Sequence, residues 1–398
     1  MSLSCVVPEP ANGPTVAPVR GLAHPGAAGD SPTFAELSTF RLGGAIGTHV
    51  ETSTEQEFID AIREADASGA PLLVLGGGSN IVPSDEPFDG VVVRDMRHEI
   101  DSIADSTCSG ASITAPAGAP WDDVVAHAVQ EEWMGLEALS GIPGTVGAAP
   151  IQNVGAYGQE VAETLSWVRV WDRLEGRTRM LARGELSLSY RDSLLKRSLR
   201  DSDAGGGRIW GPTGRWVVLE VNFQLRLASL SGPVRYAELA GVLDVPMGTR
   251  VESRELRLAV LGLRRGKGMV LEDADHDSWS AGSFFTNPIV TDSEAASLPV
   301  DAPRYPVVDH TAIHQIGGEP ALVEGIVKTS AAWLIQHAGF QRGFSLPGSN
   351  AALSSRHVLA ITNRGGATGA EVRALRDAVV AGVEESFGLT LVPEPVIL

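Results

Sequence analysis

The sequence predicts a mixed α+β fold on three observations. Helical patterns and short apolar runs alternate along the whole chain instead of falling into separate blocks. Two glycine-rich stretches lie in the first half, and the second half has none of that density. The 398 residues, 43% of them hydrophobic, suffice for two or three domains and for a core that encloses a ligand. We therefore expect a cofactor-binding half followed by a substrate-binding half.

Helices are indicated by capping residues and by apolar residues at helical spacing. Capping boxes begin at Thr54 and at Thr368, and Gly69 and Gly388 end the two helices. Further helical sequence covers 121–131, 236–265 and 329–337. Apolar runs typical of strands cover 72–75, 91–93, 167–171, 216–227 and 389–398. The polar, glycine-rich segment 201–214 is expected to be a surface loop.

Composition excludes several classes of protein. A net charge of -18 argues against a general nucleic-acid binder, which needs a basic surface. No apolar run approaches the ~20 residues that span a bilayer, and the first residues lack the features of a signal peptide. We expect a cytoplasmic protein without membrane insertion. Cys5 and Cys108 lack metal-ligand spacing, so two reduced thiols and no metal site are expected.

The first chemical signal is LLVLGGGSNIV at residues 72–82. Glycines after a strand let the backbone approach a ligand, and successive N–H groups can hold an anion. The stretch is not a dinucleotide fingerprint, because Ile81 stands where Gly or Ala is needed. A tight turn between two strands explains this segment equally well.

The second signal is SGIPGTVGAAPIQNVGAYGQEV at residues 140–161. Its glycines and prolines prevent a regular helix, yet the stretch is nearly uncharged. A buried loop must satisfy its backbone N–H and C=O groups, which a diphosphate and a polar ring edge would do. A compact loop satisfied by the protein itself is the alternative.

GGGSN followed by GIPGTVGAAPIQNVGAYGQEV resembles the flavin domain of the UDP-N-acetylenolpyruvoylglucosamine reductases, which make UDP-N-acetylmuramate for peptidoglycan. The resemblance runs from STFRLGGA at residue 38 to PEPVIL at the end. It implies non-covalent FAD, NADPH as reductant and a UDP-linked enolpyruvyl amino sugar as substrate. It assigns FAD contacts to Gly76, Gly77, Gly78, Ser79, Asn80, Gly141, Ile142, Pro143, Gly144, Thr145, Gly147, Ala148, Asn153, Gly155 and Ala156.

The resemblance also implies the domain organisation. The family fold is a two-subdomain FAD-binding fold of the vanillyl-alcohol-oxidase type followed by a C-terminal α+β substrate domain. The expected divisions are a disordered leader over 1–33, an FAD-binding domain over 34–228 split near 105, a substrate domain over 229–388, and a C-terminal strand over 389–398.

Reduction of an enol ether conjugated to a carboxylate requires groups that stabilise developing negative charge, and a proton donor. Arg191 in SYRDS offers a forked cationic donor, although alone it could simply pair with Asp192 at the surface. The resemblance implies that Arg191 stabilises the enolic intermediate. By the same resemblance Ser283, in SAGSFFTNP, is the proton donor, although a lone serine more often only forms a turn.

Glu394 lies between two prolines in the tail LTLVPEPVIL. It could be an edge-strand glutamate that points to solvent. The resemblance makes it the catalytic glutamate, although the family commonly reads P-E-V there and this chain has Pro395 after the glutamate. The remaining substrate-binding residues implied by the resemblance are Tyr190, Tyr236, Lys267, Asn287 and His357.

Each of these substrate residues has a plainer interpretation. Lys267 could belong to a solvated cationic helix end, Tyr236 could be a half-buried surface aromatic, and His357 could be structural. Two rival functions stay open at this point. One is an FAD-linked oxidase of a hydroxy acid or sugar alcohol on the same fold, and the other is a module that binds a flavin or sugar nucleotide without turnover.

Overall fold

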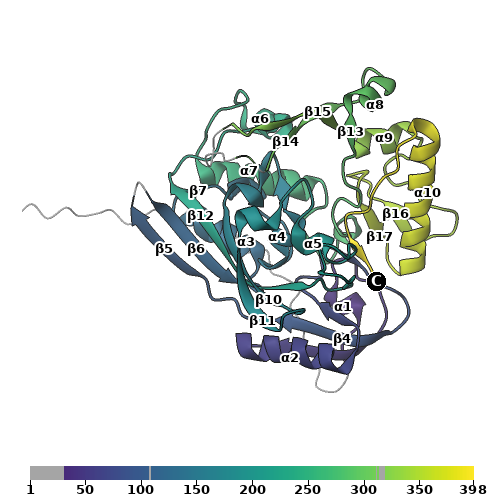
Figure 1. The fold of residues 1–398 in the computed structure, drawn as a ribbon. Coiled ribbons are helices and arrows are strands. Elements are labelled where there is room, and N and C mark those ends of the chain that lie inside the picture. Colours follow the sequence, from purple (N-terminus) through teal and green to yellow (C-terminus); the bar gives the residue numbers. More distant parts are fainter. Residues whose placement is uncertain (1–30, 107–108, 311, 313–318) are drawn as a thin grey trace, which may run out of the picture.

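The structure, a computed structural model, describes residues 31–106, 109–310, 312 and 319–398. Most of the predicted leader over 1–33, together with Cys5 and Cys108, lies outside these ranges. Helices and strands alternate along the described chain, as the sequence predicts (Figure 1). Within these ranges no helix is long and apolar enough to cross a membrane.

A small parallel sheet opens the described chain. Its strand order is β1-β4-β2, and α2 packs against it through Phe58 and Ile62. The Thr54 side chain accepts a hydrogen bond from Glu57 N at the start of α2, and Gly69 ends the helix at φ 73°. The elements are α1 (Phe34–Leu37), β1 (Ile46–Thr52), α2 (Glu55–Ser68), β2 (Leu72–Val74), β3 (Ile81–Val82) and β4 (Phe88–Asp95).

A larger antiparallel sheet follows, with the order β11-β10-β12-β6-β5 and β7 paired to β12. The change of sheet falls between Asp95 and Asp101. Trp121 of α3 packs edge-on against Phe223 of β12 in the core of this part. Its main elements are β5 (Asp101–Ser106), β6 (Gly110–Pro116), α3 (Trp121–Gln130), β7 (Trp133–Met134), β10 (Leu165–Asp172), β11 (Arg177–Ala182) and β12 (Trp216–Leu227).

Short elements connect α3 to β10 and β11 to β12. They contain the second glycine-rich loop and the SYRDS motif. They are η1 (Glu137–Leu139), α4 (Ala148–Gln152), β8 (Gly155–Ala156), β9 (Gln159–Glu160), η2 (Val161–Glu163), η3 (Arg183–Leu186) and α5 (Leu194–Arg197).

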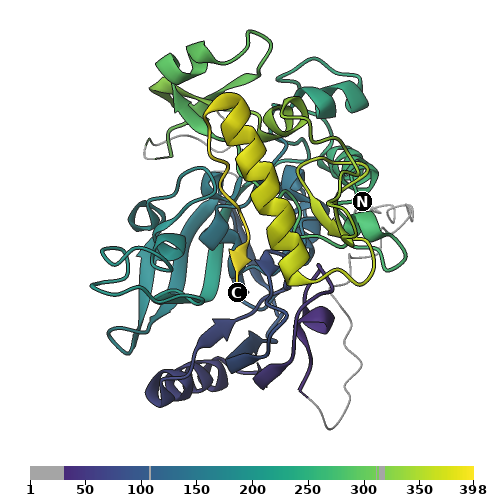
Figure 2. The ribbon, with the colours of Figure 1, turned by 90° about the vertical axis from the view of Figure 1, so that its right-hand side faces the viewer.

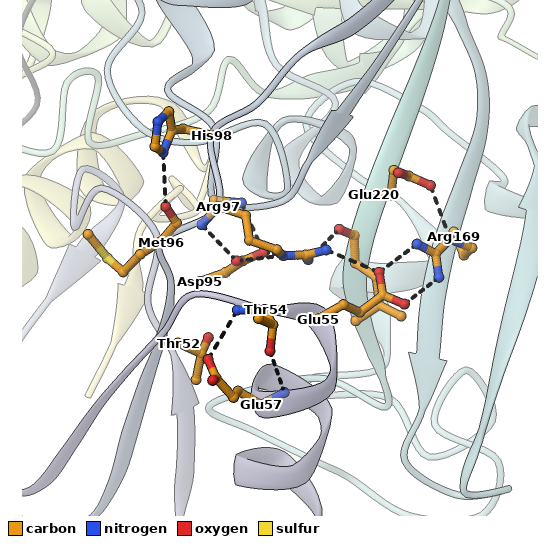
Figure 3. A network of polar contacts seen from close by, with 12 residues as sticks. Thr52, Thr54, Glu55, Glu57, Asp95, Met96, Arg97, His98, Arg169 and Glu220 are labelled. Carbon is orange, nitrogen blue, oxygen red and sulfur yellow. Dashed lines mark hydrogen bonds and ion pairs between the residues drawn. The ribbon is translucent and has the colours of Figure 1, made fainter.

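A chain of ion pairs joins the two sheets (Figure 3). Glu55, the first residue of α2, accepts hydrogen bonds from Arg169 of β10 at 2.6 and 2.5 Å and from Arg97 at 3.1 Å. Arg97 also pairs with Asp95 at 2.7 Å, and Arg169 pairs with Glu220 of β12 at 3.1 Å. These contacts run from the first sheet to the second and so hold the two sheets together.

The C-terminal part contains the helices α6 to α10 (Figure 1). The long helix α10 lies on its outer side (Figure 2), and α9 and α10 share a core with the hairpin β16-β17. Phe40 joins this core and packs edge-on against Phe284, which ties the C-terminal part to the segment between α1 and β1. The elements are α6 (Ala237–Leu243), α7 (Ser253–Gly266), η4 (His276–Ser278), β13 (Ile289–Thr291), α8 (Asp292–Ser297), β14 (Arg304–Val308), β15 (Leu322–Thr329), α9 (Ala331–His337), β16 (Ala351–Leu353), β17 (Ile361–Asn363), α10 (Gly369–Phe387) and β18 (Val396–Ile397).

The prediction of a strand over 389–398 was wrong in its extent. Only β18 is a strand, and it pairs in parallel with β3. Pro393 and Pro395 have no N–H group to donate to a strand partner, so regular pairing begins only after them. Glu394 therefore lies just before the strand. Its N–H donates to Phe284 O at 2.9 Å, and Val396 N donates to Asn80 O at 3.0 Å, so the tail runs between these two segments.

Candidate functional site

Residues from both sheets and from the C-terminal part line a cavity of about 510 Å³. Every predicted catalytic and substrate-binding residue lines it, although Tyr190 and Glu394 are 204 positions apart in the sequence. They are Arg191, Ser283, Glu394, Tyr190, Tyr236, Lys267, Asn287 and His357. Of the predicted FAD-binding residues, all but Gly141 and Asn153 also line this cavity.

The two glycine-rich loops meet inside the cavity. A Cβ atom on Gly77 would lie 2.8 Å from Gly144 Cα, so the loops touch where neither has a side chain. Gly78 has φ 62°, and its Cβ would lie 2.0 Å from Leu37 O. Within the described part of the chain, the backbone N–H groups of residues 76–79 donate to no backbone acceptor. Unpaired N–H groups beside a close backbone approach suit the diphosphate of FAD.

Gly141 and Asn153 support the second loop from outside the cavity lining. Gly141 N donates to Asp122 Oδ1 at 2.6 Å, and Gly141 O accepts from Arg264 Nε at 3.1 Å. Asn153 is fully buried, and its Nδ2 donates to Ser189 O at 2.9 Å and to Glu160 Oε2 at 3.0 Å. Both residues therefore take part in contacts that hold the backbone in place. From the sequence alone, this role could not be distinguished from direct contact with FAD.

Arg191 points at the tail and not at its neighbour in sequence. Its Nε lies 3.2 Å from Glu394 Oε1, and its Nη2 donates to Gly155 O at 2.6 Å. Asp192 pairs with Arg197 instead. Burial lowers the pKa of Arg191, but the negative charge of Glu394 and nearby groups raises this pKa by more than burial lowers it. The guanidinium therefore stays charged. The simple surface pair between Arg191 and Asp192 is therefore not formed.

The backbone of Arg191 adopts a left-handed conformation, with φ 54°. Non-glycine residues adopt this region at a cost, and such residues cluster at functional sites. Lys196 Nζ donates to Arg191 O at 2.9 Å and itself lines the cavity. Burial lowers the pKa of Lys196, while the Glu394 carboxylate opposes that shift. Sequence reasoning missed Lys196, although it lies five residues after Arg191 on the next short helix, α5.

Ser283 follows Gly282 on a turn that carries Phe284 into the core. Its Oγ lies 3.3 Å from Nε2 of His357, which also lines the cavity. Burial lowers the pKa of His357 to about 4, and the charges of nearby lysine and arginine side chains lower it as well. The imidazole is therefore neutral near pH 7. The pairing joins two predicted site residues that sequence reasoning treated separately.

The other predicted substrate residues surround the same space. Lys267 pairs with Glu238 and lies 5.6 Å from the ring centre of Tyr157, which in turn packs edge-on against Tyr236. Tyr236 is 43% exposed, so its ring is not enclosed by the core.

Asn287 and Tyr190 lie together on another side of the cavity. Asn287 Oδ1 accepts from Ala331 N at 2.9 Å, and Asn287 N donates to Tyr190 Oη at 3.4 Å.

Part of the predicted surface loop 201–214 reaches into the cavity. Pro212, Thr213 and Gly214 line it, and Thr213 Oγ1 accepts a hydrogen bond from Val74 N at 2.7 Å. The expectation of a purely surface loop was therefore wrong for its last three residues. The segment lacks any periodic pattern that could reveal the contact. Among the described residues, no group of three or more His, Cys, Asp or Glu side chains could hold a metal ion.

Comparison with known proteins decides the family. The FAD binding domain model matches residues 48–181, and the model of the UDP-N-acetylenolpyruvoylglucosamine reductase C-terminal domain matches residues 274–398. The reductase of that name from Saccharopolyspora erythraea is 47% identical over 389 residues, which cover 93% of this chain and 96% of that protein. The chain belongs to the UDP-N-acetylenolpyruvoylglucosamine reductase family.

Other members of the UDP-N-acetylenolpyruvoylglucosamine reductase family agree. The Cutibacterium acnes reductase is 44% identical over 92% of this chain and 89% of its own length. The crystal structure of the Thermus caldophilus reductase matches with a TM-score of 0.55 at 21% identity, over 92% of this chain and 97% of that one, which shows a shared fold. The predicted α+β class, the FAD-binding domain and the family are thus confirmed.

Proposed function

We propose that this chain reduces UDP-N-acetylglucosamine enolpyruvate to UDP-N-acetylmuramate in the cytoplasm, as a step in peptidoglycan precursor synthesis. NADPH is the proposed reductant and FAD the bound cofactor. One observation carries the proposal: the hydroxyl of Ser283, the guanidinium of Arg191 and the carboxylate of Glu394 line one cavity together with both glycine-rich loops. Family membership supports the same reaction.

The proposed division of labour follows the two halves of the chain. Residues 34–228 hold FAD, with the backbone N–H groups of the first loop and the cavity-facing part of the second loop around its diphosphate. When bound, FAD supplies the hydride that adds to one vinyl carbon. Residues 229–388 together with the tail supply the groups that contact the sugar nucleotide.

Arg191 stabilises the negative charge that develops on the enolpyruvyl group. Its hydrogen bond to Gly155 O and its ion pair with Glu394 hold the guanidinium in a fixed orientation, so little reorganisation is needed during the reaction. A fork is suited to a planar carboxylate, which a point charge matches less well. We propose that Glu394 positions Arg191 and that the two side chains together form a polar part of the cavity lining.

Ser283 delivers a proton to the other vinyl carbon. A serine hydroxyl is a weak acid, but a carbanion is a strong base, so the transfer is feasible in a site that excludes water. Lys267 and Tyr236, with Asn287 and Tyr190, contact the sugar nucleotide, and the ammonium of Lys267 suits the diphosphate.

Substrate-dependent oxidation of NADPH tests the proposal. The purified protein is loaded with FAD and mixed anaerobically with NADPH, with and without the enolpyruvyl sugar nucleotide. We expect turnover only with the sugar nucleotide and one saturated product per NADPH. Fast reoxidation by air with a hydroxy acid as electron donor would favour the oxidase, and binding without turnover would favour a binding module.

A further inference from the structure

His357 is the hydrogen-bonding neighbour of the proposed proton donor. The distance from its Nε2 to Ser283 Oγ is 3.3 Å. The side chains come from segments 74 positions apart, and both line the cavity. A serine that must give its proton to carbon needs its O–H bond aimed at that carbon, so whatever contacts Oγ decides where the proton points.

The position of His357 is fixed by its own loop. Asp277 Oδ1 accepts from Ser355 N at 2.8 Å and from Ser354 Oγ at 2.9 Å. Ser354 Oγ in turn accepts from His357 N at 3.2 Å. Asp277 also accepts a hydrogen bond from Arg364 at 2.8 Å. Asp277, in η4, therefore ties the turn that carries the imidazole to η4 and to Arg364.

Three cations lower the pKa of the buried His357 ring. Lys267 and Arg264 face it from the end of α7, and Arg342 faces it from the loop after α9. Together with burial they keep the ring neutral at physiological pH. A neutral imidazole has one N–H group, on Nε2 or on Nδ1. The same cations favour negative charge on Ser283 Oγ as its proton leaves.

We propose that His357 is a positioning residue whose Nε2–H donates to Ser283 Oγ and so directs the serine proton toward the substrate carbon. The inference rests on the proposed function. In the step, the serine O–H bond breaks and a C–H bond forms. The resulting alkoxide is stabilised by the Nε2–H donor until water returns a proton to it. With the other tautomer, Nε2 would accept the serine proton and turn it away from the substrate.

Two substitutions separate donation from bulk. His357→Gln keeps an N–H donor, whereas His357→Leu keeps volume alone. The two half-reactions are followed by flavin absorbance: reduction by NADPH, then reoxidation by the enolpyruvyl substrate without oxygen. We expect His357→Leu to slow reoxidation ~10²–10³-fold, the cost of one donor at developing negative charge, and to leave reduction by NADPH within about 2-fold. His357→Gln should retain most of the rate.

Controls distinguish the possible failures. His98→Leu, at an exposed histidine, should match the wild type in both half-reactions. Reoxidation is measured at saturating substrate, so that any loss of a contact between His357 and the substrate is separated from the proposed effect on proton transfer. If the wild type does not reduce the substrate, the proposed function itself is wrong. If the wild type does and His357→Leu matches it, only the inference is overturned.

The tautomer can be observed without turnover. With ¹⁵N-labelled histidine, the His357 signal is the one lost in His357→Gln among the nine histidines of the chain. We expect an Nε2–H tautomer that does not titrate between about pH 5.5 and 8.5, well above a pKa of about 4. An Nδ1–H tautomer, or titration in that window, would overturn the inference.

Discussion

Gly77→Ala tests whether the contact between the two glycine-rich loops is needed for FAD. The Cβ of an alanine at this position would lie 2.8 Å from Gly144 Cα. Carbon atoms in contact prefer about 3.5–4.0 Å, so the loops must part by roughly 1 Å. The φ of Gly77 is ordinary, so the change adds steric overlap without backbone strain.

Overpacking of this kind costs about 1–3 kcal/mol. The apoprotein can relieve the overlap by parting the loops, whereas a diphosphate held between them requires the original spacing. The cost therefore falls mainly on FAD binding. At 1.4 kcal/mol per tenfold change, the dissociation constant for FAD should rise about 5- to 150-fold.

The assay is a titration of apoprotein with FAD, followed by quenching of flavin fluorescence. The matched control is Gly184→Ala, whose Cβ would meet nothing within 4 Å and whose φ is also ordinary. We expect the control to bind FAD as the wild type does. If Gly77→Ala binds FAD with an unchanged dissociation constant, the two loops do not form the cofactor cradle and the reasoning is refuted.

Three further predictions concern the polar groups. Arg191→Lys should slow reoxidation by the enolpyruvyl substrate ~10²-fold or more in stopped flow, since a point charge cannot replace the fork; an unchanged rate would contradict its role. Asp122→Ala leaves the buried Arg257 guanidinium unpaired and should lower the free energy of unfolding by about 3–5 kcal/mol in urea, against at most about 0.5 for Asp60→Ala at an exposed pair; equal losses would contradict this. The pKa of Glu160 is lowered: burial raises it, but the hydrogen bond from the His310 ring and nearby positive charges lower it more. Its stabilisation is therefore complete above the unfolded pKa of about 4.3 and is lost as pH falls through the lower folded pKa, so Glu160→Gln should flatten acid unfolding monitored by circular dichroism. An equally steep acid transition in that variant would contradict the prediction.

Local signals in the sequence predicted the helices well. The capping box at Thr54 and the glycine at position 69 give α2 both of its ends. The same two signals, at Thr368 and Gly388, bound α10. These signals succeed because a capping hydrogen bond and a left-handed glycine act within one turn of the chain.

The strands of the C-terminal part were harder to predict. The sheet β13-β15-β14 was not expected, because consecutive residues of β14 and β15 are exposed and so lack the alternation of buried and exposed residues that marks a strand. The extent of β18 was overestimated, since an apolar run does not show that its prolines cannot donate hydrogen bonds.

The convergence of the site is a property of the fold, which no spacing in the sequence reports. Ser283, Arg191 and Glu394 could be assigned roles only by resemblance to a family. The structure adds their surroundings: the partner of Arg191 is Glu394, and the partner of Ser283 is His357. Contacts such as that of Thr213 with Val74 join residues 139 positions apart and leave no local pattern.

The central claim is that these three side chains act on one substrate in one cavity, and a single-turnover experiment on Ser283→Ala tests it most directly. The enzyme is first reduced by NADPH without oxygen and then mixed with the enolpyruvyl sugar nucleotide. The account predicts that Ser283→Ala is reduced at the wild-type rate but reoxidised by the substrate at least ~10²-fold more slowly. Reoxidation of this variant at the wild-type rate would contradict the account.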